Sequence, residues 1–257
     1  MYHPPAGPVR AGVVFVHAFA EEMNKSRHLV AQASRALAAQ GLGVLLIDMK
    51  GCGDSTGLFE DASWDDWRSD VHLAVQFMRG RGHARLALWG MRLGALLAAQ
   101  CAAEMPIGVT RCVFWQPVLQ GETHLVQFLR LRLASAMFSG TKSDETGKVL
   151  RARLAAGESI EVAGYLLSPA MAARLSSLDL ASLRPPCPVS WFEVIADEQR
   201  ALTPAASRVI AAWQGLGTSV HLTPVAAEPF WGASNAAELV QCPALVEATS
   251  RQAQAWF

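Results

Sequence analysis

The chain has 257 residues, and its 22 basic and 22 acidic side chains give a formal net charge of zero. Hydrophobic residues make up 51% of the chain and charged residues 17%, which allows a large core and excludes a disordered protein. The balanced charge argues against nucleic-acid binding, which needs a local excess of Lys and Arg.

Strand-like and helix-like segments alternate along the chain. The segments 12–19, 43–51, 85–90, 111–117, 189–197 and 219–225 predict strands, and helices are expected over 26–40, over 64–80 and after residue 92. The strand segments are continuously apolar, as is typical of strands covered by helices on both faces. This alternation predicts an α/β fold with right-handed crossovers and a mostly parallel sheet.

Residues 121–182 interrupt the alternation. They read mostly as helix, broken by the polar stretch "SGTKSDETGK", and contain no clear sheet strand. We interpret them as a helical cap or insertion at the carboxyl edge of the sheet, where α/β proteins bind ligands. The expected organisation is therefore a core formed by residues 1–120 and 183–257, with a cap at 121–182.

The cysteines give no sign of a metal or disulfide framework. No CxxC pair occurs, and the spacing matches no common metal site. We therefore expect no metal, no cofactor and reduced thiols in a cytoplasmic protein. Prolines, and not basic residues, precede the first apolar segment, so no signal peptide is expected. No apolar run reaches the roughly 18 residues of a membrane span. The five positions are Cys52, Cys101, Cys112, Cys187 and Cys242.

The stretch "LWGMRLGALLA" contains an unusual motif. Gly90 and Gly94 have the spacing of the nucleophile elbow G-x-S-x-G, in which a serine sits on a strained turn between a strand and a helix. Arg92 stands at the position of that serine. Because a guanidinium stays protonated at physiological pH, Arg92 cannot attack a carbonyl carbon.

Several motifs in the required order resemble the α/β-hydrolase fold along nearly the whole chain. They are "VHAFAEEMNKSRHL", "DMKGCGDSTG", "LWGMRLGALLA" and the acidic "IADE". More narrowly, "FAEEMNKSRH", "GCGDSTG", "WGMRLGALLA" and "EPFW" resemble the second of two hydrolase families that accompany the exosortase A system. The resemblance implies a central sheet flanked by helices, hydrolase ancestry and a setting of PEP-CTERM sorting and exopolysaccharide production.

The catalytic triad must still be tested residue by residue, because fold alone does not establish function. Asp197 ends a predicted strand at the place of the triad acid. The triad histidine should fall near Glu228 or Pro229, whereas His221 lies earlier, inside a predicted strand. With the hydroxyl and the imidazole both missing from their positions, a standard serine mechanism is rejected.

Other groups near the expected site leave alternatives open. Cys52 in "KGCGDS" is a candidate displaced nucleophile, although free cysteines more often serve as small buried side chains. His124, beside Glu122, is a candidate general base or else a surface residue at a helix start. His17 ends the first long strand and is expected to hold loop amides.

Two adjacent carboxylates, Glu21 and Glu22, lie in the loop that supplies an oxyanion hole in hydrolases. One of them is expected to form a bidentate bridge with Arg92 across the old site. Alternatively, Arg92 at the start of a helix forms a pocket for an anion. The expected elbow site comprises His17, Phe19, Glu21, Glu22, Met91 and Arg92, and its candidate aromatic lining comprises Trp64, Trp67, Trp115 and Trp231.

Three hypotheses for function follow. The preferred one is a degenerate hydrolase that binds a small anionic, acyl or glycan-linked ligand. The second is an active hydrolase or acyltransferase on an ester or thioester, using an unconventional nucleophile or a water. The third is a non-catalytic scaffold for a protein partner in exopolysaccharide assembly, and a closed Arg92–carboxylate bridge would favour it.

Overall fold

The computed structural model describes residues 1–105, 108–138, 145–195, 202–232 and 240–257. The chain divides into two compact units. The first consists of Met1–Ile47, Val71–Leu119 and Leu180–Phe257, and the second of Asp48–Asp70 and Gln120–Asp179. The role of the segment 121–182 as a cap stays a prediction.

A large sheet forms the centre of the first unit. Within the described residues it has seven strands in the order β1-β3-β2-β4-β5-β8-β9, and only β1 runs antiparallel to its neighbour. The strands are β1 Tyr2–His3, β2 Ala11–Val16, β3 Leu42–Leu46, β4 Leu86–Met91, β5 Arg111–Trp115, β8 Val189–Ile195 and β9 Val220–Ala226. The predicted mostly parallel sheet is confirmed.

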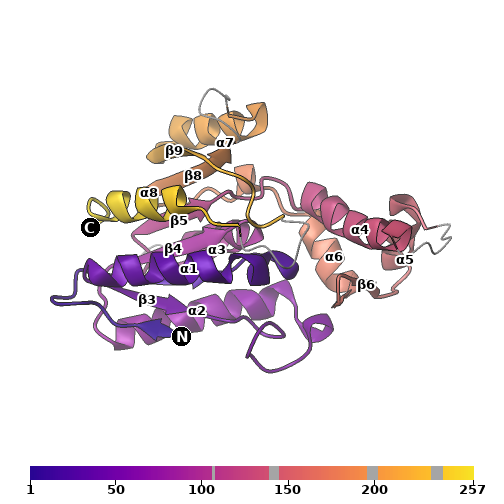
Figure 1. The fold of residues 1–257 in the computed structure, drawn as a ribbon, viewed down its shortest axis with the longest axis horizontal. Coiled ribbons are helices and arrows are strands. Elements are labelled where there is room, and N and C mark those ends of the chain that lie inside the picture. The colour runs from indigo at the N-terminus through magenta and orange to yellow at the C-terminus, as the bar shows by residue number, and fades with distance from the viewer. Residues whose placement is uncertain (106–107, 139–144, 196–201, 233–239) are drawn as a thin grey trace. The chain divides into compact units, whose positions relative to one another are not determined.

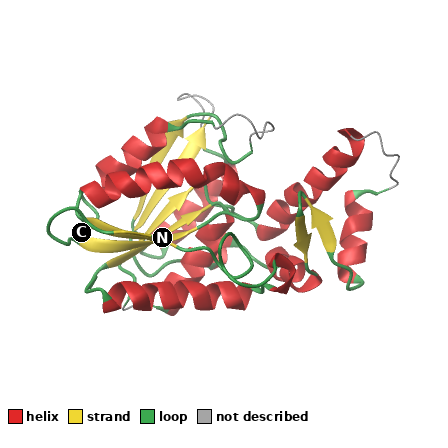
Figure 2. Ribbon diagram, turned by 60° about the horizontal axis from the view of Figure 1, so that its bottom comes forward, coloured by secondary structure: helices red, strands yellow, loops and turns green. Residues whose placement is uncertain are grey.

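Helices cover both faces of this sheet (Figure 2). Helices α1 and α8 lie side by side on one face and contribute to a common core with it (Figure 1). The helices are α1 Glu21–Ala39, α2 Trp64–Gly80, α3 Leu93–Glu104, α7 Pro204–Gly215 and α8 Pro243–Ala253, with a short 3-10 helix at Leu180–Ser182. Among the described helices, none combines the length and the apolar character that crossing a membrane requires.

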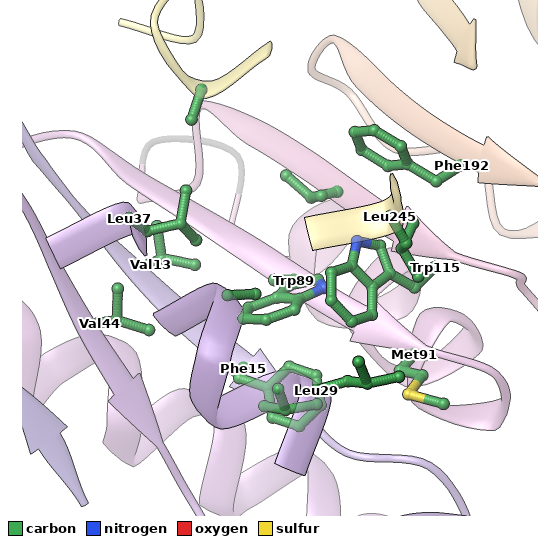
Figure 3. Packing of buried hydrophobic residues seen from close by; sticks show 14 of the residues in the cluster. Val13, Phe15, Leu29, Leu37, Val44, Trp89, Met91, Trp115, Phe192 and Leu245 are labelled. Carbon is green, nitrogen blue, oxygen red and sulfur yellow. The ribbon is translucent and has the colours of Figure 1, made fainter. Parts of the chain in front are cut away.

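Aromatic side chains fill the core between the sheet, α1 and α8. The Trp89 ring lies with its centroid 4.6 Å from the ring of Phe15 and 4.6 Å from that of Trp115, in edge-to-face arrangements (Figure 3). The indole of Trp115 donates a hydrogen bond to Thr249 Oγ1 of α8 at 2.9 Å. This packing holds β4, the strand that leads into the elbow, against its neighbours β2 and β5.

The second unit is mainly helical. It contains α4 Gly121–Phe138, α5 Gly147–Ala155, α6 Pro169–Ser176, a 3-10 helix at Phe59–Asp61, the first residues of α2, and an antiparallel pair of short strands, β6 Ile160–Val162 and β7 Tyr165–Leu167. Thr146 and Ser168 cap α5 and α6 with their side chains. Glu145 joins α4 to α5 by accepting from both Arg132 and Arg153.

Candidate active site

The elbow is formed by the end of β4, Arg92 and the start of α3. Arg92 has φ 52° and ψ −118°, a conformation that non-glycine residues rarely adopt. A Cβ atom on Gly94 would lie 2.3 Å from the carbonyl oxygen of Val16 and 2.4 Å from that of His17. The elbow helix therefore approaches the end of β2 so closely that only glycine fits, as in an elbow that carries a nucleophile.

Two further residues with positive φ follow neighbouring strands of the same sheet. Ala20 (φ 50°) lies in the loop after β2, and Gln116 (φ 43°) directly follows β5. Each such residue costs on the order of 1–3 kcal/mol, and backbone strain of this kind clusters at functional sites. Three strained positions at the carboxyl ends of adjacent strands thus mark this edge as the candidate site.

The Arg92 side chain is paired with Glu22. Its Nε and Nη2 atoms both donate to Glu22 Oε1, at 3.1 and 3.0 Å, and its Nη1 donates to the carbonyl oxygen of Gln116 at 3.4 Å. The Arg92 and Glu22 side chains are only 12% and 11% exposed. The expected bridge thus forms with Glu22, but both hydrogen bonds reach one oxygen instead of two.

Of the four candidate tryptophans, Trp231 contacts Arg92. The guanidinium carbon lies 4.8 Å from the centroid of the Trp231 ring, a cation–π geometry. Trp115 is fully buried in the core, whereas Trp64 and Trp67 are buried residues of the second unit. Trp231 therefore holds the guanidinium from one side while Glu22 binds its edge.

Two more carboxyl groups belong to the same unit. Burial raises the pKa of Glu21 above its ordinary value, and the neighbouring Glu22 carboxylate raises it further. Burial also raises the pKa of Glu193, although hydrogen bonds from Trp191 and Gln116 act in the opposite direction. The unit thus holds buried carboxyl groups that prefer the protonated form more than exposed ones do.

Two carboxylate oxygens at the start of α1 lack a described hydrogen-bond partner. The Oε2 atoms of Glu21 and Glu22 are buried and have no hydrogen-bond partner among the residues that the structure describes. The positive charge of Arg92, by contrast, is already matched by Glu22.

The remaining residues of the expected elbow site are buried. His17 is 3% exposed, and its Nδ1 lies 2.7 Å from the carbonyl oxygen of Ala18, so this hydrogen bond in the loop after β2 goes to a carbonyl group, whereas loop amides were expected. Phe19, in the loop after β2, and Met91, the last residue of β4, are buried hydrophobic residues.

The predicted catalytic residues lie outside the compact unit that holds Arg92 or outside the described residues. Asp197 lies outside the described residues. Cys52 and His124 are buried residues of the second unit, so a role beside Arg92 stays a prediction. Glu122, the expected partner of His124, forms an ion pair with Arg151 at 2.5 Å. His221 lies within β9, as predicted, and is exposed.

Gln116 and Glu193 were missed by the sequence reading. The side chain of Gln116 accepts from the backbone N–H of Val194 at 2.6 Å and donates to Glu193 Oε1 at 3.3 Å. A polar residue directly after "RCVFW", at the end of the strand beside the elbow, was the available signal. Glu193 lies inside an apolar strand and gave none.

The comparisons with solved structures agree with this architecture. The chain is similar to Est1E from Butyrivibrio proteoclasticus with bound ferulic acid, with 14% identity and a TM-score of 0.73 over 100% of this chain and 94% of that one. It is similar to a monoacylglycerol lipase of Paleococcus ferrophilus, with 15% identity and a TM-score of 0.65 over 100% of this chain and 98% of that one. It is also similar to a proline iminopeptidase of Mycobacterium smegmatis, with 16% identity and a TM-score of 0.57 over 100% of this chain and 94% of that one. At these identities the likeness shows the fold alone, which is the α/β-hydrolase fold.

No curated protein matches the sequence. The family described as serine aminopeptidase S33, Hydrolase_4, matches residues 7–157, which is more than half of the chain and includes the elbow. The chain therefore belongs to the serine aminopeptidase S33 family of α/β-hydrolase-fold proteins.

Proposed function

We propose that this protein is a degenerate member of its family, which binds a ligand at the elbow and does not hydrolyse it by the serine mechanism. The Arg92–Glu22 ion pair carries the loss of the serine mechanism, and the exposed part of Trp231 carries the binding of a ligand. The ion pair occupies the place of the nucleophile, and its two side chains are nearly buried. A guanidinium cannot form an acyl intermediate, and exchange of the serine alone removes the reacting group.

The charges at the elbow distinguish between the anionic, acyl and glycan-linked ligands considered above. An anion would have to compete with Glu22 for the guanidinium of Arg92. A ligand without charge would not have to compete for the guanidinium. The exposed part of Trp231 offers an apolar surface for a sugar ring. A neutral glycan therefore fits this site better than an anion.

The resemblance to the exosortase-associated family supports the same ligand class. That family accompanies exopolysaccharide production, in which oligosaccharides are the material handled. The same setting supports the scaffold hypothesis, because a nearly closed ion pair at the elbow is compatible with a protein that acts only through a partner.

Calorimetric titration with two probe classes tests the proposal. One class is a panel of neutral oligosaccharides, and the other is inorganic phosphate with a sugar phosphate. We expect the wild type to bind oligosaccharides and Trp231→Ala to lose that binding. Phosphate should bind only to Glu22→Gln, because that variant lacks the carboxylate that neutralises Arg92.

The two other outcomes are distinct. Phosphate binding by the wild type, weakened in Arg92→Gln, would show an anion pocket and contradict the assignment to a neutral glycan. Binding of neither class by the wild type would contradict ligand binding and leave the scaffold hypothesis.

One observation favours an active enzyme as the second candidate. The pKa of Glu21 is raised by burial, and a carboxylate whose pKa is raised is a stronger base. Glu21 would then take a proton from a water that attacks an ester or thioester carbonyl. Turnover by the wild type that disappears in Glu21→Gln, with the fold retained, would support this candidate.

A further inference from the structure

A second cluster of reactive side chains lies at the far end of the elbow helix, in the same compact unit. It consists of His72 on α2 with Cys101 and Glu104 on α3. The candidate ligand atoms of these three residues all lie within 4.8 Å of one another. His72 Nε2 is 3.1 Å from Glu104 Oε2. The cluster therefore brings a nitrogen, a sulfur and a carboxylate oxygen to one point.

The local structure explains why these atoms converge. Cys101 and Glu104 are three residues apart on α3, and residues at this spacing lie on the same helix face. Cys101 is fully buried, whereas the side chains of His72 and Glu104 are 33% and 27% exposed. The cluster thus combines a buried thiol with two partly exposed ligand groups.

We propose that His72, Cys101 and Glu104 bind a zinc ion. Imidazole nitrogen, thiolate sulfur and carboxylate oxygen are the ligands of protein zinc sites, and a sulfur ligand disfavours calcium and magnesium. Cys101 binds as the thiolate, its proton passing to solvent. Three protein ligands leave a fourth, tetrahedral position to a water molecule.

Gln100 has the position of a residue that orients the site. Its Nε2 donates to Glu104 Oε1 at 3.1 Å, while the other carboxylate oxygen faces His72. Hydrogen bonds of this kind hold a metal-binding carboxylate in place. Gln100 is thus a positioning residue for the proposed ion.

The expected role of the ion is structural. It would link α2 to the last turn of α3, the helix that begins after Arg92. A ligand that binds only the folded state raises the melting temperature. Zinc should therefore stabilise the protein whether or not the elbow binds anything, so this proposal does not depend on the proposed function.

Zinc titration of the reduced full chain, by calorimetry and thermal unfolding, tests the site. We expect one zinc ion per chain and a rise in Tm for the wild type, both lost in His72→Ala and Cys101→Ser. Gln100→Ala should weaken binding by about 10- to 100-fold. Cobalt in place of zinc should give thiolate charge-transfer absorption that Cys101→Ser removes.

Two variants serve as matched controls. Cys187→Ala removes another buried cysteine, whose sulfur lies 3.8 Å from that of Cys112, and His221→Ala removes an exposed histidine. Both should bind zinc as the wild type does. The proposal is overturned if the wild type binds no zinc, if Cys101→Ser retains wild-type affinity, or if Cys187→Ala abolishes binding.

Discussion

Arg92 stands at the nucleophile position of an elbow whose backbone frame is intact. The elbow keeps its strained φ of 52° and its close contact at Gly94, but its side chain now forms an ion pair and stacks on an indole. A charge this far removed from water is tolerated only with a partner. Glu22, at the start of α1, is that partner.

Removing either partner should therefore be costly. Arg92→Ala and Glu22→Ala are each expected to lower the free energy of unfolding by about 3–5 kcal/mol, because each leaves an uncompensated buried charge. The double variant should lose less than the sum of the two, a coupling that urea unfolding of all four proteins measures in a double-mutant cycle.

The exposed pair of Arg251 and Glu247 on α8 is the matched control. Its side chains are 71% and 72% exposed, so Arg251→Ala should change stability by less than about 0.5 kcal/mol. Additive losses in the Arg92 and Glu22 variants would contradict the pairing.

The pH dependence of stability should report Glu21. Its pKa in the folded protein is raised, so the folded state binds more protons than the unfolded state above about pH 4.3, the ordinary value for Glu. The stability that Glu21 contributes is present below that pH and is lost as the pH rises through the raised pKa. Glu21→Gln should remove this part of the fall in Tm, measured by thermal unfolding at several pH values.

Glu247→Gln removes an exposed carboxyl group and should keep the wild-type pH dependence. A Glu21→Gln curve parallel to that of the wild type would contradict the assignment of a raised pKa to Glu21.

At the scale of elements, the sequence predicted those whose apolar pattern is continuous. The helix expected over 64–80 is α2, and all six predicted strands occur in the sheet. The predictions were wrong mainly at the ends of elements, where loops begin. The strand expected over 12–19 ends at Val16 because the chain turns through the strained Ala20, and the helix expected from residue 26 begins at Glu21.

Short and long-range features escaped the sequence reading. β1 has only two residues, too few for a pattern, and depends on pairing with β3. The short β6–β7 pair lies inside a segment read mostly as helix. The cluster of His72, Cys101 and Glu104 was missed, since metal motifs are read from spacing in sequence and these ligands come from two helices.

The close contact between α3 and β2 leaves no room for a side chain at Gly94. Gly94→Ala should destabilise the protein by about 1–3 kcal/mol or more, because the added methyl group meets backbone oxygens that cannot rotate away. Gly80→Ala, at the end of α2, is the control: a Cβ there meets nothing within 4 Å. Urea unfolding should show it to be neutral or slightly stabilising, and an equal loss in both variants would contradict the account.

At the scale of the whole molecule, family membership and chemistry point in different directions. The S33 family match and the similarity to the structures of Est1E and of a monoacylglycerol lipase describe the frame, from the seven-stranded sheet of the described residues to the elbow. The groups that make such a frame reactive were expected at three positions. Arg92 fills the first, and Asp197 lies outside the described residues. The imidazole was expected after β9, near Glu228 and Pro229, and its absence from that loop stays a prediction about the triad.

The central claim is that this site no longer performs serine-type hydrolysis. The most direct measurement is turnover of aryl esters of several acyl lengths and of acyl-CoA thioesters, by the wild type, Arg92→Ala and Cys52→Ala. The account predicts no turnover above the buffer rate by any of them. Turnover by the wild type that disappears in Cys52→Ala would reveal a displaced nucleophile, and turnover lost only in Arg92→Ala would make the arginine part of a working site; either result would contradict the claim.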